Sequence, residues 1–126
     1  MLTIGKSGTA AVTVTEKNTA KAAGSGSLDV FATPMMIALM EQAACQCMAD
    51  SLEDTQTSVG TQVNVAHTAA SPLGANISAT ATINVIEGRK ISFVVTAHDG
   101  VNEIGKGTHE RFIVDAERFM KKLEER

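Results

Sequence analysis

Apolar and polar residues alternate in long runs along the second half of the chain. In residues 75–85 every odd position is apolar and every even position is Asn, Ser or Thr. A similar alternation follows in residues 91–97 and 104–114, and an earlier run covers residues 59–69. A period of two is typical of a strand with one face on the core and the other in water. The pattern therefore predicts four strands, separated by turns at residues 71–74, 87–89 and 98–102.

One long helix is predicted ahead of these strands. From Met35 to about Ser51 the chain is mostly Met, Ala, Leu, Ile and Cys, with no internal Gly or Pro. Thr33-Pro34 fits the start of this helix, with Thr as a capping residue and Pro in the first helical position. Because the helix is apolar on most sides, we expect other elements to wrap it. A further strand is predicted over residues 9–15, and a short charged helix over residues 115–125.

The order of strand, helix and four strands predicts an α+β fold with residues 1–126 as a single domain. Short turns make antiparallel neighbours, so we expect the last four strands to pair in sequence order. The result is a five-stranded antiparallel sheet around a long central helix, which is the hotdog arrangement. Residues 21–27 are expected to be a flexible, turn-rich connection. Small residues on the inner face would let the helix approach closely: Ala79, Ala81, Ala97, Gly105 and Gly107.

Composition narrows the classes of function. Aromatic residues make up 3% of the chain and the net charge is −3, which argues against nucleic-acid binding and attraction to an anionic membrane. No apolar run approaches the ~20 residues of a membrane span, and the start lacks a signal-peptide pattern. Cys45 and Cys47 project to opposite sides of the predicted helix and are not expected to pair, so a reducing cytoplasm fits. No metal or cofactor is predicted, because His67, His98 and His109 show no ligand spacing with these cysteines.

Three polar residues are candidates for chemistry, each with a structural alternative. Glu41 lies among apolar helical residues, where an unpaired carboxylate is costly, unless it faces water at the helix edge. His67 shares its phase with Val59 and Val63 on the apolar strand face, either as a core histidine or as an active one. Thr33 either only caps the helix or lies where the positive end of the helix dipole stabilises an anion. A hydroxyl, an imidazole and a carboxylate are together the parts of a hydrolytic nucleophile system.

The spacing of these residues does not fit a site made within one helix. Thr33 and Glu41 are eight residues apart, which corresponds to ~12 Å along a helix axis. Direct contact between them within one chain is therefore not expected. The spacing suggests a site assembled between two subunits.

Six short motifs between Val30 and Arg111 carry a family resemblance. They are Val30–Thr33, Leu39–Glu41, Ser58–Thr61, Val65–Ala69, Ala97–Gly100 and Ile104–Arg111. These motifs and the distances between them resemble the fluoroacetyl-CoA thioesterase family of hotdog enzymes. The resemblance implies an acyl-CoA thioesterase in which Thr33, Glu41 and His67 form the catalytic triad. It also implies that Gly60 and Arg111 lie near the acyl group, in a homodimer whose sheets join edge to edge.

The resemblance begins at Val30 and leaves the acyl group open. Family members that select a fluorinated acyl group carry a longer N-terminal lid with bulky aromatic residues ahead of the helix. Here residues 24–29 contain no aromatic residue, and the first one is Phe31. Phe31 and Met36 are expected to contact a small or medium aliphatic acyl group, because Met fills irregular apolar space.

The expected mechanism uses His67 as general base and then general acid, since an imidazole titrates near neutral pH. Thr33 either attacks the thioester carbonyl or aligns a water, and Glu41 either orients the imidazole or acts on that water. The Gly60 amide is a candidate oxyanion donor. His98 and His109 are expected to mark turns or strand faces. Two alternatives stay open at this point: a hotdog enoyl-CoA hydratase or dehydratase, and a non-catalytic acyl-CoA-binding dimer.

Overall fold

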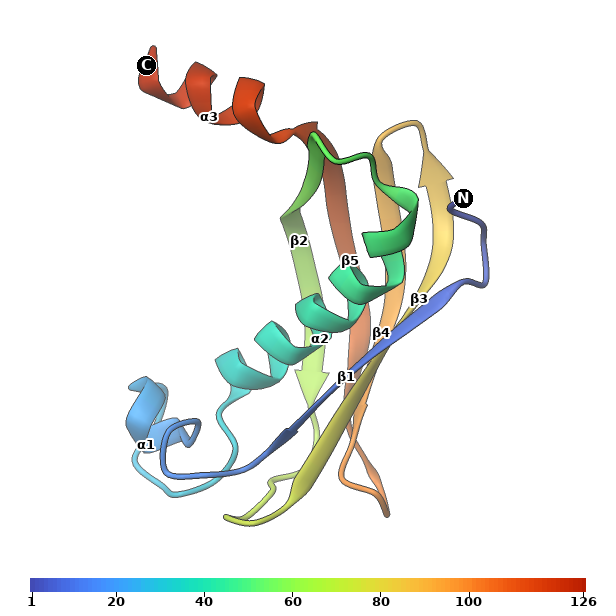
Figure 1. Cartoon of the computed structure of the whole chain (residues 1–126). Coiled ribbons are helices and arrows are strands. Elements are labelled where there is room, and N and C mark those ends of the chain that lie inside the picture. The colour runs from blue at the N-terminus through green and yellow to red at the C-terminus, as the bar shows by residue number, and fades with distance from the viewer.

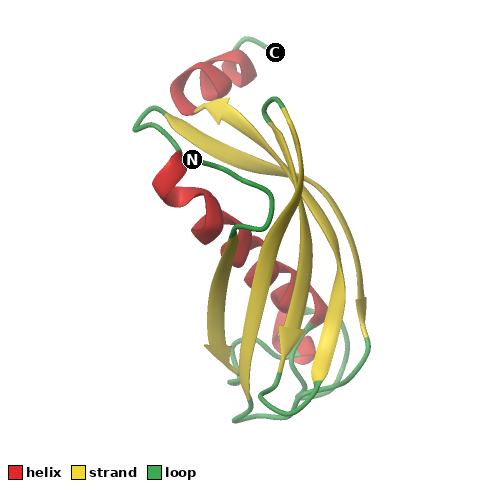
Figure 2. Cartoon of the chain, turned by 90° about the vertical axis from the view of Figure 1, so that its right-hand side faces the viewer, coloured by secondary structure: helices red, strands yellow, loops and turns green.

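Five antiparallel strands form one sheet that curls around a single long helix (Figures 1 and 2). The computed structural model describes all residues from Met1 to Arg126. Its strands are β1 (Ser7–Thr13), β2 (Gln56–His67), β3 (Asn76–Glu87), β4 (Lys90–His98) and β5 (Glu103–Asp115). Its helices are α1 (Ala20–Ala23), α2 (Thr33–Met48) with a 3-10 turn at Ala49–Ser51, and α3 (Ala116–Glu124). The predicted α+β hotdog fold is confirmed.

The predicted strand order is wrong for β2. The order across the sheet is β1-β3-β4-β5-β2, so β2 pairs with β5 and not with its successor β3. Tight turns join β3, β4 and β5 as expected, but the longer segment between His67 and Asn76 carries the chain to the other side of the sheet. β1 then pairs with β3, and β2 is left as an edge strand.

Helix α2 buries one face against the concave side of the sheet. It packs mainly on β1 and β3 and touches β2 much less. The buried positions recur at helical spacing: Met36, Leu39, Met40, Ala43, Ala44, Cys47 and Met48. On the opposite face Gln42, Cys45 and Gln46 are exposed, so the helix is not wrapped on all sides within one chain. Cys45 and Cys47 do project to opposite sides, as predicted.

The interpretation of Thr33 as a helix cap is wrong. Ala32 occupies the N-cap position, and its carbonyl oxygen accepts hydrogen bonds from the N–H groups of Met35 and Met36. Thr33 is already helical, and no side chain caps the helix. Its hydroxyl is therefore free to bond elsewhere.

A β-bulge in β2 changes which residues face the helix. Gly60 pairs with Arg111, but the register shifts between Gly60 and Gln62. Because one extra residue is inserted there, the side-chain alternation changes phase. Val59 consequently lies on the outer face, and the prediction that it shares a face with His67 is wrong.

The predicted flexible connection contains a short helix. Thr19 caps α1 by accepting a hydrogen bond from the Ala22 N–H at 3.1 Å, and Gly24 ends it with a φ of 74°. Residues 25–29 that follow are exposed loop. At the other end of the chain, α3 projects away from the sheet and buries none of its residues (Figure 1). None of the helices combines the length and apolarity needed to cross a bilayer.

Small residues set how closely α2 approaches the sheet. Ala79, Ala81 and Ala97 on the inner face are fully buried. Gly8 on β1 touches the helix backbone, because a Cβ there would overlap the carbonyl oxygen of Ala43 and the amide nitrogen of Cys47. The distance between the helix and the sheet therefore depends on the small side chains at these positions.

Substitution of Gly8 should destabilise the fold strongly. We expect Gly8→Ala to lower the free energy of unfolding by about 3 kcal/mol, because both contacting atoms belong to the backbone and cannot move aside. Gly105→Ala is the comparison, since the nearest atom to its new Cβ would be the flexible Met36 thioether; we expect a loss of about 1 kcal/mol there. Urea denaturation measures both, and equal losses would contradict this account of the packing.

Candidate active site

The first polar cluster joins the start of α2 to the end of β2. Thr33 Oγ1 lies 2.8 Å from His67 Nδ1, which is a hydrogen bond across elements far apart in sequence. The start of α2 and the end of β2 both lie in the lower half of the molecule in Figure 1. Thr33 is exposed and His67 is half-buried, so an outside molecule can reach the hydroxyl. This arrangement lets the imidazole accept the hydroxyl proton when the ring carries its own proton on Nε2.

The surroundings of His67 favour the neutral imidazole. Burial lowers the pKa of His67 below its ordinary value, and the nearby Ala69 backbone carbonyl opposes this shift in part. Its Nε2 atom is buried and makes no hydrogen bond within the chain. A neutral ring at pH 7 is the form that acts as a general base.

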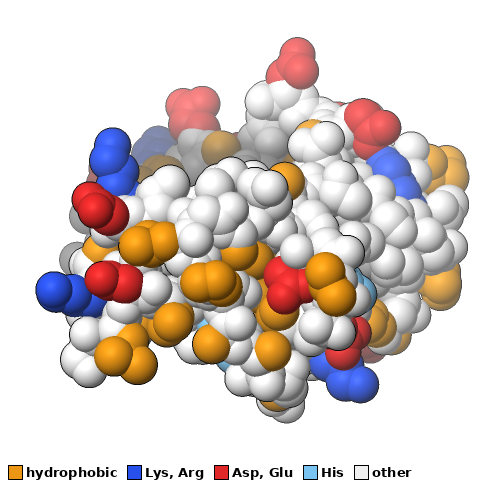
Figure 3. Space-filling model, turned by 90° about the horizontal axis from the view of Figure 1, so that it is seen from below, with side chains coloured by type: hydrophobic (Ala, Val, Ile, Leu, Met, Phe, Trp, Pro, Cys, Tyr) orange, Lys and Arg blue, Asp and Glu red, His pale blue; other side chains and the backbone are white.

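The region around His67 is small and largely uncharged. A cavity of about 180 Å³ lies beside the ring, lined by Phe31, Thr68, Ala69 and Ala70. Seen from below, apolar side chains are exposed on this face together with Asp and Glu side chains, while Lys and Arg side chains stand near the margin of the view (Figure 3). The residues that line the cavity itself carry no acidic or basic side chain other than His67, so the cavity suits a short apolar group better than a charged one.

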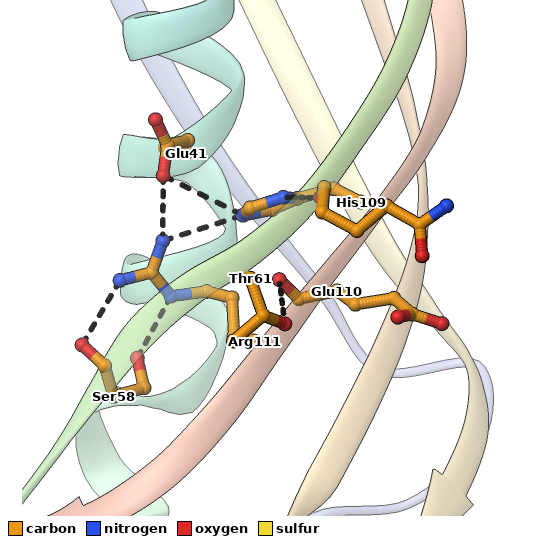
Figure 4. Close-up of polar contacts among 7 residues, drawn as sticks. Glu41, Ser58, Thr61, His109, Glu110 and Arg111 are labelled. Atoms are coloured by element: carbon orange, nitrogen blue, oxygen red, sulfur yellow. Dashed lines mark hydrogen bonds and ion pairs between the residues drawn. The ribbon is translucent and has the colours of Figure 1, made fainter.

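The second polar cluster centres on Arg111 of β5 and is drawn in Figure 4. Arg111 Nη1 donates to Glu41 Oε2 at 3.0 Å, which is an ion pair between the sheet and α2. Its Nε and Nη2 atoms donate to the hydroxyl and the carbonyl oxygen of Ser58 at 2.8 and 3.0 Å. The guanidinium is almost fully buried, whereas the Glu41 side chain is 38% exposed. The cost of Glu41 among apolar residues is thus offset by Arg111.

His109 completes this cluster, which sequence reasoning did not detect. Its ring is 1% exposed and stacks on Phe93, with ring centroids 6.1 Å apart. Nδ1 lies 2.8 Å from the Gln62 carbonyl oxygen, and Nε2 lies 3.3 Å from Arg111 Nη1 and 3.8 Å from Glu41 Oε2. Burial lowers the pKa of His109 more than the Gln62 carbonyl raises it, and Arg111 lowers it further. The only signal in the sequence was its position two residues before Arg111, on the same strand face.

Gly60 is held against the Glu41 carboxylate. A Cβ at this position would lie 2.5 Å from Glu41 Oε2 and 3.3 Å from Arg111 Nη1, so a side chain there would displace the ion pair. An open hollow of about 730 Å³ borders Glu41 and Arg111 along the exposed face of α2. Glu41, Gly60 and Arg111 therefore lie together beside an accessible space.

The predicted site residues thus form two groups rather than one. Thr33 and His67 are in contact, with Phe31 buried beside the His67 ring. Glu41, Gly60 and Arg111 are in contact about two helical turns away, or ~12 Å along the axis. Met36 is fully buried in the core against Gly105, the residue that pairs with His67. Within one chain the structure does not bring Glu41 to Thr33.

Comparison with known proteins matches both the fold and the motifs. The family model of the fluoroacetyl-CoA-specific thioesterase FlK matches residues 14–117. The chain belongs to this family. It is 47% identical over 98 residues to the fluoroacetyl-CoA thioesterase of Streptantibioticus cattleyicolor, which is 78% of this chain and 70% of that protein. The family likeness therefore starts well before Val30, and the chain is a thioester hydrolase.

Solved structures agree with this assignment. A crystal structure of a point mutant of the thioesterase FlK superposes with a TM-score of 0.93 at 38% identity, covering 99% of this thioesterase and 97% of that chain. A complex of such a mutant with fluoroacetate and CoA gives 0.88 at 40% identity, over 94% and 99% of the two chains. A Thermus thermophilus member of the thioesterase superfamily gives 0.88 at 25% identity, over 99% and 95%. The hotdog thioesterase fold is common to all of them.

The lowered pKa values of His67 and His109 should make the thioesterase less stable in mild acid. His67 and His109 both have a lowered pKa in the folded state, so the unfolded chain takes up protons first as the pH falls through 6.5. We therefore expect the free energy of unfolding to fall between pH 7 and pH 5. Asp50 and Asp99, whose pKa values lie below 3.8, stay ionised over this range.

The matched variants are His109→Gln, which should flatten part of this pH dependence, and His98→Gln, which changes an exposed residue and should not. Denaturant titrations at each pH give the slopes. Parallel slopes for wild type and His109→Gln would show that His109 does not contribute.

Proposed function

We propose that this thioesterase hydrolyses a short acyl-CoA, with fluoroacetyl-CoA as the first substrate to test, at a site shared by two subunits. The 2.8 Å contact between Thr33 Oγ1 and His67 Nδ1 carries this proposal. The substrate class follows from the likeness to the fluoroacetyl-CoA thioesterase of S. cattleyicolor and from the small apolar cavity at His67. A cytoplasmic location remains a prediction from the sequence.

The Thr33–His67 pair would supply the proton transfers. In one route Thr33 Oγ attacks the thioester carbonyl carbon while its proton passes to His67 Nδ1. The tetrahedral intermediate then expels the CoA thiolate, which takes the proton from His67, and water hydrolyses the resulting acyl ester. In the other route Thr33 aligns a water that attacks directly. Both routes need a neutral imidazole at the start, and the lowered pKa of His67 favours it.

A second subunit is proposed because, within one chain, the Thr33–His67 pair and the Glu41 carboxylate lie too far apart to act on the same acyl group. Glu41, Gly60 and Arg111 are in contact with one another but lie ~12 Å along α2 from Thr33. Along β2, Gly60 and His67 are seven residues apart, which is ~23 Å. No short acyl group can touch both ends of that distance. Two copies related by a twofold axis would let the Thr33–His67 end of one meet the Glu41 end of the other.

Several features of the chain support such a homodimer. β2 is an edge strand with free backbone groups on one side, which a second β2 could pair with in antiparallel fashion. Its inner face is incompletely covered by α2, and Val63 there is 39% exposed. An antiparallel pairing centred on Asn64 would set the partner's Gly60 opposite His67, since each lies three pairing positions from that centre when the bulge at Thr61 and Gln62 counts as one position. Glu41 and the Gly60 amide would then reach the acyl group from the other subunit, as orienting carboxylate and oxyanion donor.

Hydrolysis is tested by release of free CoA thiol. We expect turnover of fluoroacetyl-CoA or another short acyl-CoA by the wild type, and a loss of about 1,000-fold or more in kcat for Thr33→Ala and His67→Ala, because each removes part of the proton-transfer pair. Thr33→Ser keeps the hydroxyl and is the matched control. Equal rates for the wild type and His67→Ala, both at the buffer level, would favour a binding dimer, and water addition to an enoyl-CoA would favour the hydratase alternative.

Mixed dimers test whether two subunits share the site. His67→Ala and Glu41→Ala should each be nearly inactive alone. When they are co-expressed and mix at random, half of the dimers contain both variants, and each such dimer regains one intact site. We therefore expect about a quarter of the wild-type rate per total protein. No recovery, with mixed dimers verified by two affinity tags, would mean that each site is built from a single chain.

A further inference from the structure

We propose that His109 is a positioning residue: as a neutral ring with its proton on Nδ1, it holds the Arg111 guanidinium against Glu41. This rests on the proposed function for its catalytic consequence, though not for its geometry. His109 touches neither Thr33 nor His67, so its effect would pass through Arg111 and Glu41 to the shared site.

The β-bulge fixes the tautomer of His109. The register shift between Gly60 and Gln62 leaves the Gln62 carbonyl oxygen 2.8 Å from Nδ1. A carbonyl oxygen only accepts, so Nδ1 must carry the proton and donate it. Nε2 is then an unprotonated acceptor. The ring is 1% exposed and stacked on Phe93, so both of its nitrogens are shielded from bulk solvent.

The unprotonated Nε2 atom of His109 has one hydrogen-bond donor within reach. Arg111 Nη1 lies 3.3 Å away and donates, so this single nitrogen of the guanidinium serves both His109 and Glu41 Oε2. On its other side the guanidinium donates from Nε to the Ser58 hydroxyl and from Nη2 to the Ser58 carbonyl oxygen. Figure 4 shows the guanidinium held on its two sides in this way. A protonated His109 would place a second cation beside Arg111 in a buried site, so the neutral ring is required.

This arrangement leaves one oxygen of Glu41 available. All contacts of its carboxylate with Arg111 and His109 use Oε2, and Oε1 makes no hydrogen bond within the chain. Glu41 also borders the hollow of about 730 Å³ along the exposed side of α2, so Oε1 is the carboxylate oxygen left to contact a molecule there. The direction of that oxygen is what a shared site would depend on, because small displacements of an orienting group are costly in rate.

Three substitutions separate the two contacts of the ring. The amide of Asn overlaps Nδ1 of a histidine and the amide of Gln overlaps Nε2. His109→Asn thus keeps the donor to Gln62 and loses the acceptor for Arg111, while His109→Gln does the reverse. His109→Phe keeps only the stacking on Phe93. We expect kcat to stay within about threefold for Gln and to fall about 10- to 100-fold for Asn and Phe, with KM nearly unchanged.

A merely structural role predicts a different ranking. Asn and Gln each remove one hydrogen bond from the buried ring, so they should lose similar stability and, without a positioning role, similar activity. Unfolding midpoints of all three variants give that comparison, and His98→Asn is the exposed control. Wild-type kcat in His109→Asn, or equal losses in the Asn and Gln variants, would overturn the proposal.

A second readout does not depend on catalysis. Nitrogen-15 NMR of the wild type should show His109 neutral and protonated on Nδ1 at pH 7, with separate Arg111 side-chain signals that persist in His109→Gln and average in His109→Asn. A doubly protonated ring, or one protonated on Nε2, would overturn the inference even if a variant failed to fold. If the wild type hydrolyses no acyl-CoA, the proposed function fails, and these signals still decide the role of His109.

Discussion

The close contact of α2 with the concave face of the sheet is the constraint on which the site depends. Gly8 lets β1 contact the helix backbone directly. The small side chains of Ala79, Ala81 and Ala97 let the helix lie close to the concave face of the sheet. Packed interiors transmit small displacements, so a helix held this tightly fixes the position of every side chain along it. The Thr33 hydroxyl reaches His67 because the helix begins at a fixed point beside the end of β2.

A rigid helix also keeps its two polar groups apart. Thr33 and Glu41 lie on the same element, and no rotation of side chains closes ~12 Å of helical rise. The fold therefore holds the residues proposed for hydrolysis in two separate groups, one at the end of β2 and one beside its middle. Because β2 is the edge of the sheet, both groups lie where a second copy would join. This separation is the reason for our proposal that two chains share each site.

The buried guanidinium of Arg111 belongs to a polar network that joins the sheet to α2. Arg111 is buried, but its donors are matched by Glu41, Ser58 and His109. Removing one partner from such a network leaves an uncompensated charge, which is more costly than the bond itself. The bulge in β2 belongs to this network, since it supplies the carbonyl oxygen that His109 needs. The bulge in β2 is thereby connected, through His109 and Arg111, to the Glu41 carboxylate on α2.

The local pattern of the sequence was sufficient to predict the helices and strands and to identify which types of residue form the candidate site. Alternation with period two identified the four later strands, and the apolar composition after Thr33 identified α2, because both are set by short-range backbone geometry. The motifs were sufficient for the family and for Thr33, Glu41 and His67 as candidates. The tertiary structure decided what depends on contacts between distant segments: β2 beside β5, the phase change at Gly60, and the partner of the Thr33 hydroxyl. The role of His109 was invisible for the same reason, since only the folded sheet brings its ring between the Gln62 carbonyl and Arg111.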